Sequence, residues 1–144
     1  MYMKKTTDEL MNELKSEKNI GKFTIENEKT FMDKPLTEYL EFLLQKYNMK
    51  KADVIKRASL AAVYGYQIFD GKKEPKRDKV IQLAFGFGLT LEETQRLLKC
   101  AGHSELYPKV KRDVLFIYAI NNRLNKEEVE QLLFQMGENS LEVI

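Results

Sequence analysis

The chain has 144 residues, 43% of them hydrophobic and 32% charged, with a formal net charge of +2. This length allows one hydrophobic core with a small appended element, and three prolines among many helix-forming residues favour an all-α protein. No stretch of about 18 apolar residues is present, so we predict no membrane-spanning helix. The single cysteine, Cys100, excludes an intrachain disulfide. Because the N-terminal residues also lack an apolar signal-peptide core, we expect a cytoplasmic protein.

Residues 1–34 predict a short amphipathic helix followed by a tether. Leu10, Met11 and Leu14 form an apolar stripe within residues 6–18, and Thr7 is a candidate N-cap. Residues 19–34 show the least pattern, so we expect a short extended segment or a tether. Their scattered hydrophobic residues argue against low-complexity disorder. The segment therefore either packs on the rest of the chain or mediates a dimer.

Residues 35–102 are predicted to form a helical domain, because apolar side chains recur through them at helical spacing. In the second of its predicted helices, Ala52, Val54, Ile55 and Ala58 are expected to face the core. The predicted helices of this domain are 36–48, 50–57, 60–69, 76–87 and 91–101.

Residues that favour helix ends separate these predicted helices. Ser59 is the expected N-cap of the third helix, and Gly71 supplies the left-handed conformation that follows the end of that helix. Pro75 stands just before the fourth helix. Thr90 with Glu93 has the spacing of a capping box for the fifth helix.

Residues 103–144 predict a C-terminal helical hairpin that packs on this domain. Its helices are expected at 108–122 and 126–136, the second capped by Asn125 and ended by Gly137. The last apolar residues, Leu141, Val143 and Ile144, are expected to be exposed. Either the N-terminal segment or the C-terminal helices with these exposed residues are the candidate dimer surface.

The strongest charge asymmetry lies in residues 50–79. This segment holds nine Lys or Arg residues against four acidic residues, for a net charge of +5, in a chain that is otherwise close to neutral. Such clustering around a predicted helix pair is typical of a surface that faces phosphates. A solvated basic face is the plainer interpretation, but these cations flank the helix pair on both sides.

The same segment carries a recognisable order of motifs. Ala58–Ser59 forms the turn between the two helices of the pair, and Ile68 stands near the end of the second helix. The sequence Asp-Gly-Lys-Lys-Glu-Pro at 70–75 then provides a basic loop. The apolar spacings of 80–84 and 89–93 follow it.

These features resemble the lambda-repressor/Cro-like helix-turn-helix family, also called XRE, over residues 36–101. The resemblance implies a five-helix domain that regulates transcription by binding double-stranded DNA, commonly as a dimer. In this family the third helix lies in the major groove, and its N-terminal residues meet base edges. The segment after residue 100 is an extension to that domain.

The resemblance assigns two sets of candidate DNA-binding residues. Bidentate base readout needs Arg, Lys, Asn or Gln, and only Gln67 on the third helix clearly qualifies. Phosphate anchoring is therefore better supplied than base reading. The positions that match base-reading residues are Ala61, Ala62, Val63, Tyr64 and Gln67. The candidate phosphate-binding residues are Lys50, Lys51, Lys72, Lys73, Lys76 and Arg77.

No pattern in the sequence predicts an enzyme. Cys100 and His103 form a C-x-x-H pair, but two potential ligands without a second pair do not make a zinc site. The same pair lacks an orienting partner for nucleophilic catalysis. We therefore assign no catalytic residues, no metal ligands and no cofactor.

Two functions from different classes remain. The first is a DNA-binding transcriptional regulator. The second is a protein-interaction module that keeps the helix-turn-helix fold without base readout, with a kinase or another regulator as its partner. The apolar run from Ala61 to Tyr64 motivates the second, because it suits a protein surface better than a groove.

Overall fold

Helices account for all the regular secondary structure in the computed structural model, which describes residues 6–26 and 35–142. This confirms the prediction of an all-α protein. None of the helices in these ranges is long and apolar enough to cross a lipid bilayer. The chain divides into two compact units, Met1–Asp33 and Lys34–Ile144.

The first unit contains α1 (Thr7–Ser16) and α2 (Ile20–Glu26). Thr6 caps α1, one residue before the predicted cap, and it forms a reciprocal capping box with Glu9. The prediction of an extended segment or tether from residue 19 is wrong over α2. Asn19 explains the helix, because its side-chain oxygen accepts a hydrogen bond from the Lys22 amide at 3.1 Å. Residues 27–34 of the predicted tether lie outside the described ranges.

The apolar stripe predicted for α1 is not a buried face. Met11 and Leu14 are exposed, Leu10 is half-buried, and α1 has no buried residue. In α2, Phe23 is buried.

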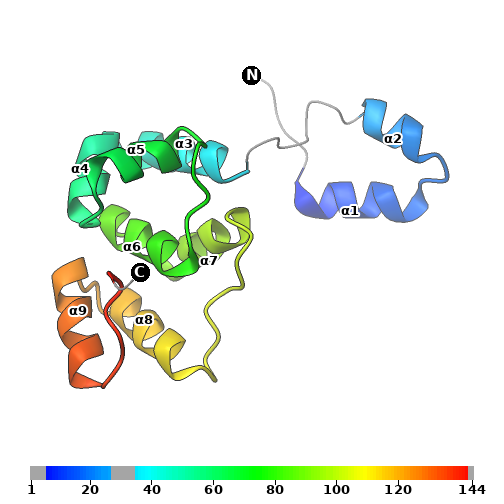
Figure 1. The fold of residues 1–144 in the computed structure, drawn as a ribbon. Coiled ribbons are helices and arrows are strands. Elements are labelled where there is room, and N and C mark those ends of the chain that lie inside the picture. The colour runs from blue at the N-terminus through cyan, green and yellow to red at the C-terminus, as the bar shows by residue number, and fades with distance from the viewer. Residues whose placement is uncertain (1–5, 27–34, 143–144) are drawn as a thin grey trace. The chain divides into compact units, whose positions relative to one another are not determined.

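The second unit is a stack of helices in three layers (Figure 1). Helices α3 to α5 form the upper layer in that view, α6 and α7 the middle layer, and α8 and α9 the lower layer. One continuous core runs through all three layers. The helices are α3 (Pro35–Tyr47), α4 (Lys51–Arg57), α5 (Ala62–Phe69), α6 (Arg77–Phe87), α7 (Leu91–Cys100), α8 (Lys111–Asn121) and α9 (Lys126–Gln135).

Helix α6 is the central element of this unit, because every residue from Val80 to Phe87 is buried. Its Gly86 lies directly against α4: a Cβ atom at this position would be 2.7 Å from the Val54 carbonyl oxygen and 2.9 Å from the Ala58 Cβ. A Cβ atom at Gly65 on α5 would lie 2.7 Å from the Ile55 side chain. Two glycines inside helices therefore allow α4 to pack closely against both α5 and α6.

A buried polar side chain joins the same helices. Gln82 on α6 is fully buried and donates a hydrogen bond of 2.9 Å to the carbonyl oxygen of Ala58, at the end of α4. Lys79 in turn donates to the Gln82 side-chain oxygen at 3.0 Å and to the Leu141 carbonyl oxygen at 3.2 Å. The network therefore extends from α4 through α6 to the segment after α9.

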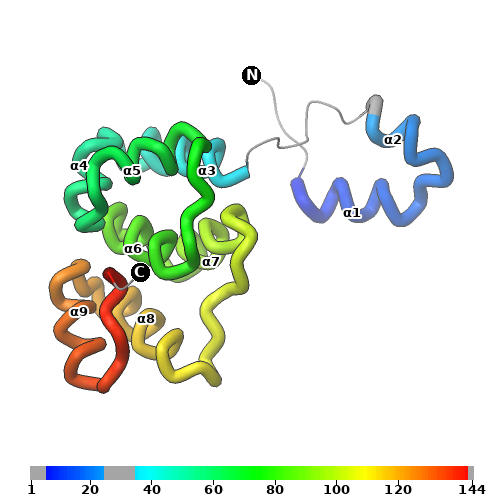
Figure 2. Tube along the Cα trace, in the orientation of Figure 1, coloured from blue at the N-terminus to red at the C-terminus, as the bar shows by residue number. Residues whose placement is uncertain are grey.

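That last segment returns from α9 towards α6 (Figure 2). Leu141 is fully buried there, and its amide donates to the Glu130 carboxylate at 3.0 Å. The expectation that Leu141 is exposed is therefore wrong, and it is not available as a dimer surface. The reason is that the chain folds back into the core after Gly137. Val143 and Ile144 lie outside the described residues.

The predicted capping boxes of the second unit are confirmed, but two predictions around α4 are wrong. Thr90 and Asn125 each form the expected capping box, with Glu93 and Glu128 respectively. Ser59 does not cap α5, because it has a left-handed backbone (φ 59°) and the N-cap is Ala61. Ala52 does not face the core but is exposed.

Glu93 does more than cap α7, because it also ties α7 to α3. Its carboxylate accepts hydrogen bonds from the Lys46 ammonium at 2.6 Å and from the Tyr47 hydroxyl. Burial by itself raises the pKa of Glu93, but these bonds and the one from the Thr90 amide outweigh it and lower the pKa from 4.5 to about 2. The pKa of Tyr47 rises to about 12, first through burial and then through its bond to Glu93.

We predict that Gly86→Ala destabilises the protein although alanine favours helices. Helix propensity alone gains about 1 kcal/mol, whereas forcing a methyl group into a packed contact costs about 1–3 kcal/mol. Thermal unfolding followed by circular dichroism should give a lower midpoint for the variant. Gly21→Ala is the control, since a Cβ atom at that position would lie 3.4 Å from the Asn19 side-chain oxygen, an ordinary contact. A raised midpoint for Gly86→Ala contradicts the close contact between α4 and α6.

We also predict that Glu93 makes stability depend on pH below 4.5. Because its folded pKa is depressed, its contribution is fully present above 4.5 and is lost as the pH falls from 4.5 towards 2. At roughly 1.4 kcal/mol per pKa unit, this contribution is about 3–4 kcal/mol. Glu93→Gln keeps a capping side chain but removes the charge, so urea unfolding should show a shallower loss of stability between pH 5 and 2.5. The exposed control Glu92→Gln should keep the pH dependence of the parent protein. If Glu93→Gln keeps it as well, the depressed pKa assigned to Glu93 is refuted.

Candidate nucleic-acid interface

Helices α4 and α5 form the pair that the basic segment surrounds. The turn between them is fixed by backbone hydrogen bonds, including one of 3.1 Å from the Leu60 amide to the Ile55 carbonyl oxygen. Leu60 itself packs against the core. Neither helix has a side chain bonded at its N-cap, which is Lys50 in α4 and Ala61 in α5. The first amides of α5 are therefore available to an external acceptor.

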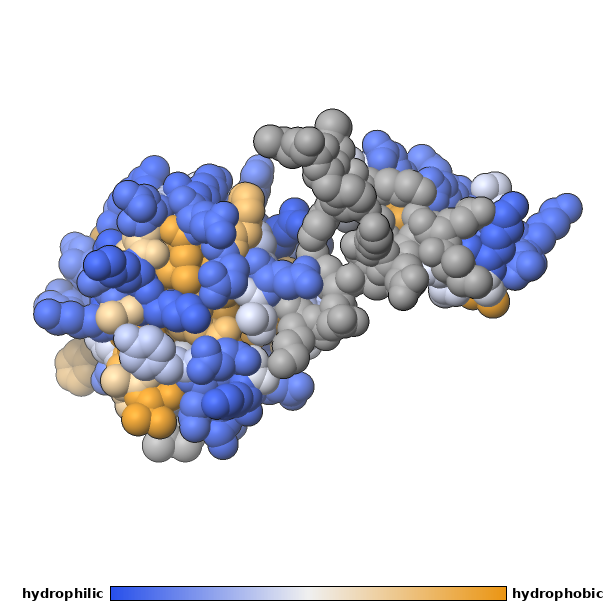
Figure 3. All heavy atoms as spheres, turned by 90° about the horizontal axis from the view of Figure 1, so that it is seen from above, coloured by the Kyte–Doolittle hydropathy of each residue, from blue (hydrophilic) through white to orange (hydrophobic). Residues whose placement is uncertain are grey.

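The outer face of α5 is exposed and largely uncharged. Ala61 and Ala62 are exposed, as are Val63, at 72%, and Tyr66, at 42%. The face of the unit seen from above is mostly hydrophilic with smaller apolar areas, not a continuous apolar surface (Figure 3). It therefore matches a surface that faces water or a polar partner.

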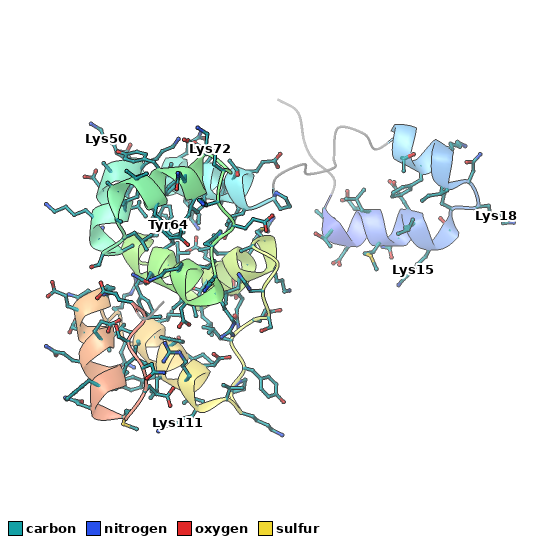
Figure 4. The ribbon with its side chains drawn as sticks, viewed as in Figure 1. Lys15, Lys18, Lys50, Tyr64, Lys72 and Lys111 are labelled. Carbon is teal, nitrogen blue, oxygen red and sulfur yellow. The ribbon has the colours of Figure 1, made fainter. Side chains whose placement is uncertain are left out.

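Two predicted base-reading positions are less accessible. Tyr64 is half-buried and packs against the core, on the side of α5 that faces α6 (Figure 4), and burial raises the pKa of its hydroxyl. Gln67 is also half-buried. The backbone carbonyl oxygen of Gln67 accepts hydrogen bonds from the backbone amides of Lys72 and Lys73, at 2.8 and 3.3 Å.

The basic loop after α5 holds three exposed lysines, Lys72, Lys73 and Lys76. Gly71 adopts the expected left-handed conformation (φ 78°), which turns the chain into this loop. Lys72 and Lys50 extend from the same edge of the unit, at opposite ends of the helix pair (Figure 4). The exposed lysines therefore flank α5 on two sides.

The other two predicted phosphate-binding cations are already engaged. Lys51 lies 3.5 Å from the Glu41 carboxylate and 3.8 Å from that of Asp70. Its ammonium is also 6.0 Å from the centre of the Phe69 ring. These contacts leave Lys51 half-buried at the edge of the surface.

Arg77 connects the start of α6 to the C-terminal extension through an ion pair and hydrogen bonds. Its guanidinium donates to both oxygens of the buried Asp113 carboxylate, at 2.8 and 2.9 Å, and to the carbonyl oxygens of Ser104 and Glu105. Burial raises the pKa of Asp113, but bonds from Arg77 and the Tyr107 amide outweigh it and lower the pKa. Arg77 is therefore unable to clamp a phosphate without breaking this pair, and we leave it out of the candidate interface.

Two further contacts hold the basic loop from the same side. The His103 ring nitrogen Nε2 lies 2.9 Å from the carbonyl oxygen of the buried Pro75. Arg112 pairs with Asp78 at 2.9 Å, one residue beyond Arg77. No local pattern predicts these contacts, because they join residues more than 25 positions apart. They make the C-terminal extension a support for the loop.

The charge that remains uncompensated is concentrated on α4 and the loop. Besides Lys79, which bonds to Gln82 and to the Leu141 carbonyl oxygen, six cations in the basic segment form no ion pair with any of the described residues. These are Lys50, Lys56, Arg57, Lys72, Lys73 and Lys76. Lys56 and Arg57, on the last turn of α4, were absent from the predicted site although they belong to the same basic segment.

The candidate interface is characterised by its exposed cations. In the part of the chain that the structure describes, no group of three or more His, Cys, Asp or Glu side chains is placed to hold a metal ion. No family model, curated protein or solved structure matches this chain. The assignment of a function therefore depends on the geometry of the helix pair and on the motif residues themselves.

Proposed function

We propose that the second unit is a helix-turn-helix domain of the lambda-repressor/Cro-like type that binds double-stranded DNA. In this proposal, α5 enters the major groove and α4 lies across the backbone. The observation that carries it is the two groups of exposed lysines at the two ends of the helix pair, Lys50 on one side and Lys72 with Lys73 on the other, which form no ion pair with any residue in the described ranges.

Phosphate contacts supply most of the affinity in this proposal. Lysines without acidic partners lose no ion pair when they meet a phosphate, and they release condensed counterions from the duplex. The uncapped N-terminus of α5 adds amide donors and a favourable helix dipole. Lys76, at the N-cap of α6, extends the same basic edge.

Base discrimination by this surface is expected to be modest. Gln67 is the one side chain on α5 suited to bidentate readout of adenine, and Val63 is exposed where it can contact a thymine methyl group. Dimerisation would double the number of base contacts. The first unit is the remaining candidate surface for a dimer, because Leu141 is buried.

A second function is favoured by one specific observation. Val63 and Tyr66 are large and exposed on the face where a DNA reader usually has polar side chains. The same face suits a protein partner, such as a kinase or another regulator. That partner would be held by apolar contact, so its binding would survive high salt and would be lost on Val63→Asp.

The two functions differ in what the basic loop contributes. We predict that Lys72→Gln/Lys73→Gln weakens binding to all duplex sequences and reduces the slope of log K against log salt by about 2. Fluorescence anisotropy with a labelled random-sequence duplex pool, at several salt concentrations, measures both quantities. Gln67→Ala should instead reduce the preference among sequences.

Lys109→Gln/Lys111→Gln is the matched control, with the same change of charge. Lys111 lies at the opposite end of the unit from Lys50 and Lys72 (Figure 4), so this variant should keep the salt slope of the parent protein. Equal losses for both pairs would indicate nonspecific attraction to a basic protein. Duplex binding that is unaffected by Lys72→Gln/Lys73→Gln would rule out the proposed interface.

A further inference from the structure

The chain's five arginines fall into two groups. Arg77 and Arg112 pair with carboxylates, and Arg96 lies over the Tyr39 ring with 5.2 Å to its centre. The guanidinium groups of Arg57 and Arg123 form no ion pair within the described ranges. These two arginines, 66 positions apart in the sequence, line the same cavity.

The cavity has a volume of about 310 Å³ and lies where the end of α4, the end of α6 and the turn between α8 and α9 meet. Its walls are otherwise apolar or uncharged, and no acidic side chain lines it. The apolar part of its wall includes side chains from α6 and α8, namely Phe85, Phe87 and Ile120.

A larger, more open cavity of about 750 Å³ adjoins it and shares Arg57, Phe85 and Asn125. That cavity has Asp53 and Glu127 on its wall beside its cations Lys56, Arg57 and Lys126, so acids accompany its cations. The smaller cavity differs from it in combining two cations with an apolar wall. Its volume is at the lower end of the range of about 300–1,000 Å³ found for ligand pockets.

The chemistry of this lining selects one class of ligand. A guanidinium group presents paired donors that match a carboxylate, sulfonate or phosphate. Two such groups with no acid between them attract an anion and repel a cation. Phenylalanine and isoleucine side chains provide contact for a ring or a short hydrocarbon body.

We propose that this cavity binds a small organic anion with an apolar body, of the aryl or acyl carboxylate class, between Arg57 and Arg123. This site goes beyond the proposed DNA binding and does not depend on it. Because Arg57 belongs to α4 and Arg123 follows α8, a bound anion connects the helix pair to the C-terminal extension. Such a ligand would stabilise the present arrangement of the two.

The probe for the test is 1-anilinonaphthalene-8-sulfonate, which combines an aromatic body with one anionic group. It is titrated into the full-length protein labelled with ¹⁵N, and amide signals are followed by NMR. Gly88 lines the cavity, whereas Gly102 and Gly137 do not. We expect a saturable shift at Gly88 with little change at the other two glycines. Absence of a saturable shift at Gly88, or equal shifts at all three, overturns the proposal.

Two single variants test the arginines without disturbing the fold. Arg123 has a left-handed backbone (φ 58°) that glycine adopts more easily, so Arg123→Gly removes the charge and relaxes the turn. Arg57→Gln changes an exposed side chain. Each should weaken probe binding about tenfold or more, whereas Lys72→Gln/Lys73→Gln should leave it unchanged. Unaltered affinity in both arginine variants would refute the site.

Discussion

The close contact between α4 and α6 is the constraint on which the second unit depends. Gly86 brings the two helices so near that the Val54 carbonyl oxygen occupies the space of a side chain. Gln82 fixes the register of the same contact through its bond to Ala58. Since α5 packs on α4 through Gly65, the position of α6 determines where the outer face of α5 points. A helix pair held in this way can present a defined surface to a partner, because little of its orientation is left to the loops.

The second organising feature is the support that the C-terminal extension gives to the basic loop. The loop begins with backbone hydrogen bonds from the Lys72 and Lys73 amides to Gln67, and the extension holds its other end. Asp113 holds Arg77 at the loop's end, and His103 contacts the Pro75 carbonyl oxygen. Arg77, which was predicted to bind a phosphate, therefore orders the residues next to it instead. Ordering the loop lowers the entropy that Lys72 and Lys73 lose when they bind a phosphate. The extension therefore contributes to the proposed interface by holding the end of the loop, not by supplying its exposed lysines.

Local signals predicted the helices of this protein well, and long-range contacts explain where prediction failed. The capping boxes at Thr90 and Asn125 involve residues only three positions apart, so the sequence predicts them directly. Leu141 was misjudged because its burial depends on the chain folding back over α6, which no local pattern encodes. Arg77 was assigned to a phosphate because its partner is 36 residues away. The unpaired state of Arg57, and the cavity that it shares, depend on tertiary structure in the same way.

The central claim is that the surface formed by α4, α5 and the loop is where DNA binds. The most direct measurement is amide chemical-shift mapping of the ¹⁵N-labelled full-length protein during titration with a random-sequence duplex pool. The account predicts that the largest changes fall on Lys50, Val63, Gly71 and Lys72, and that they diminish as salt is added. Changes centred instead on α8 and α9, or no change at physiological salt, would contradict it.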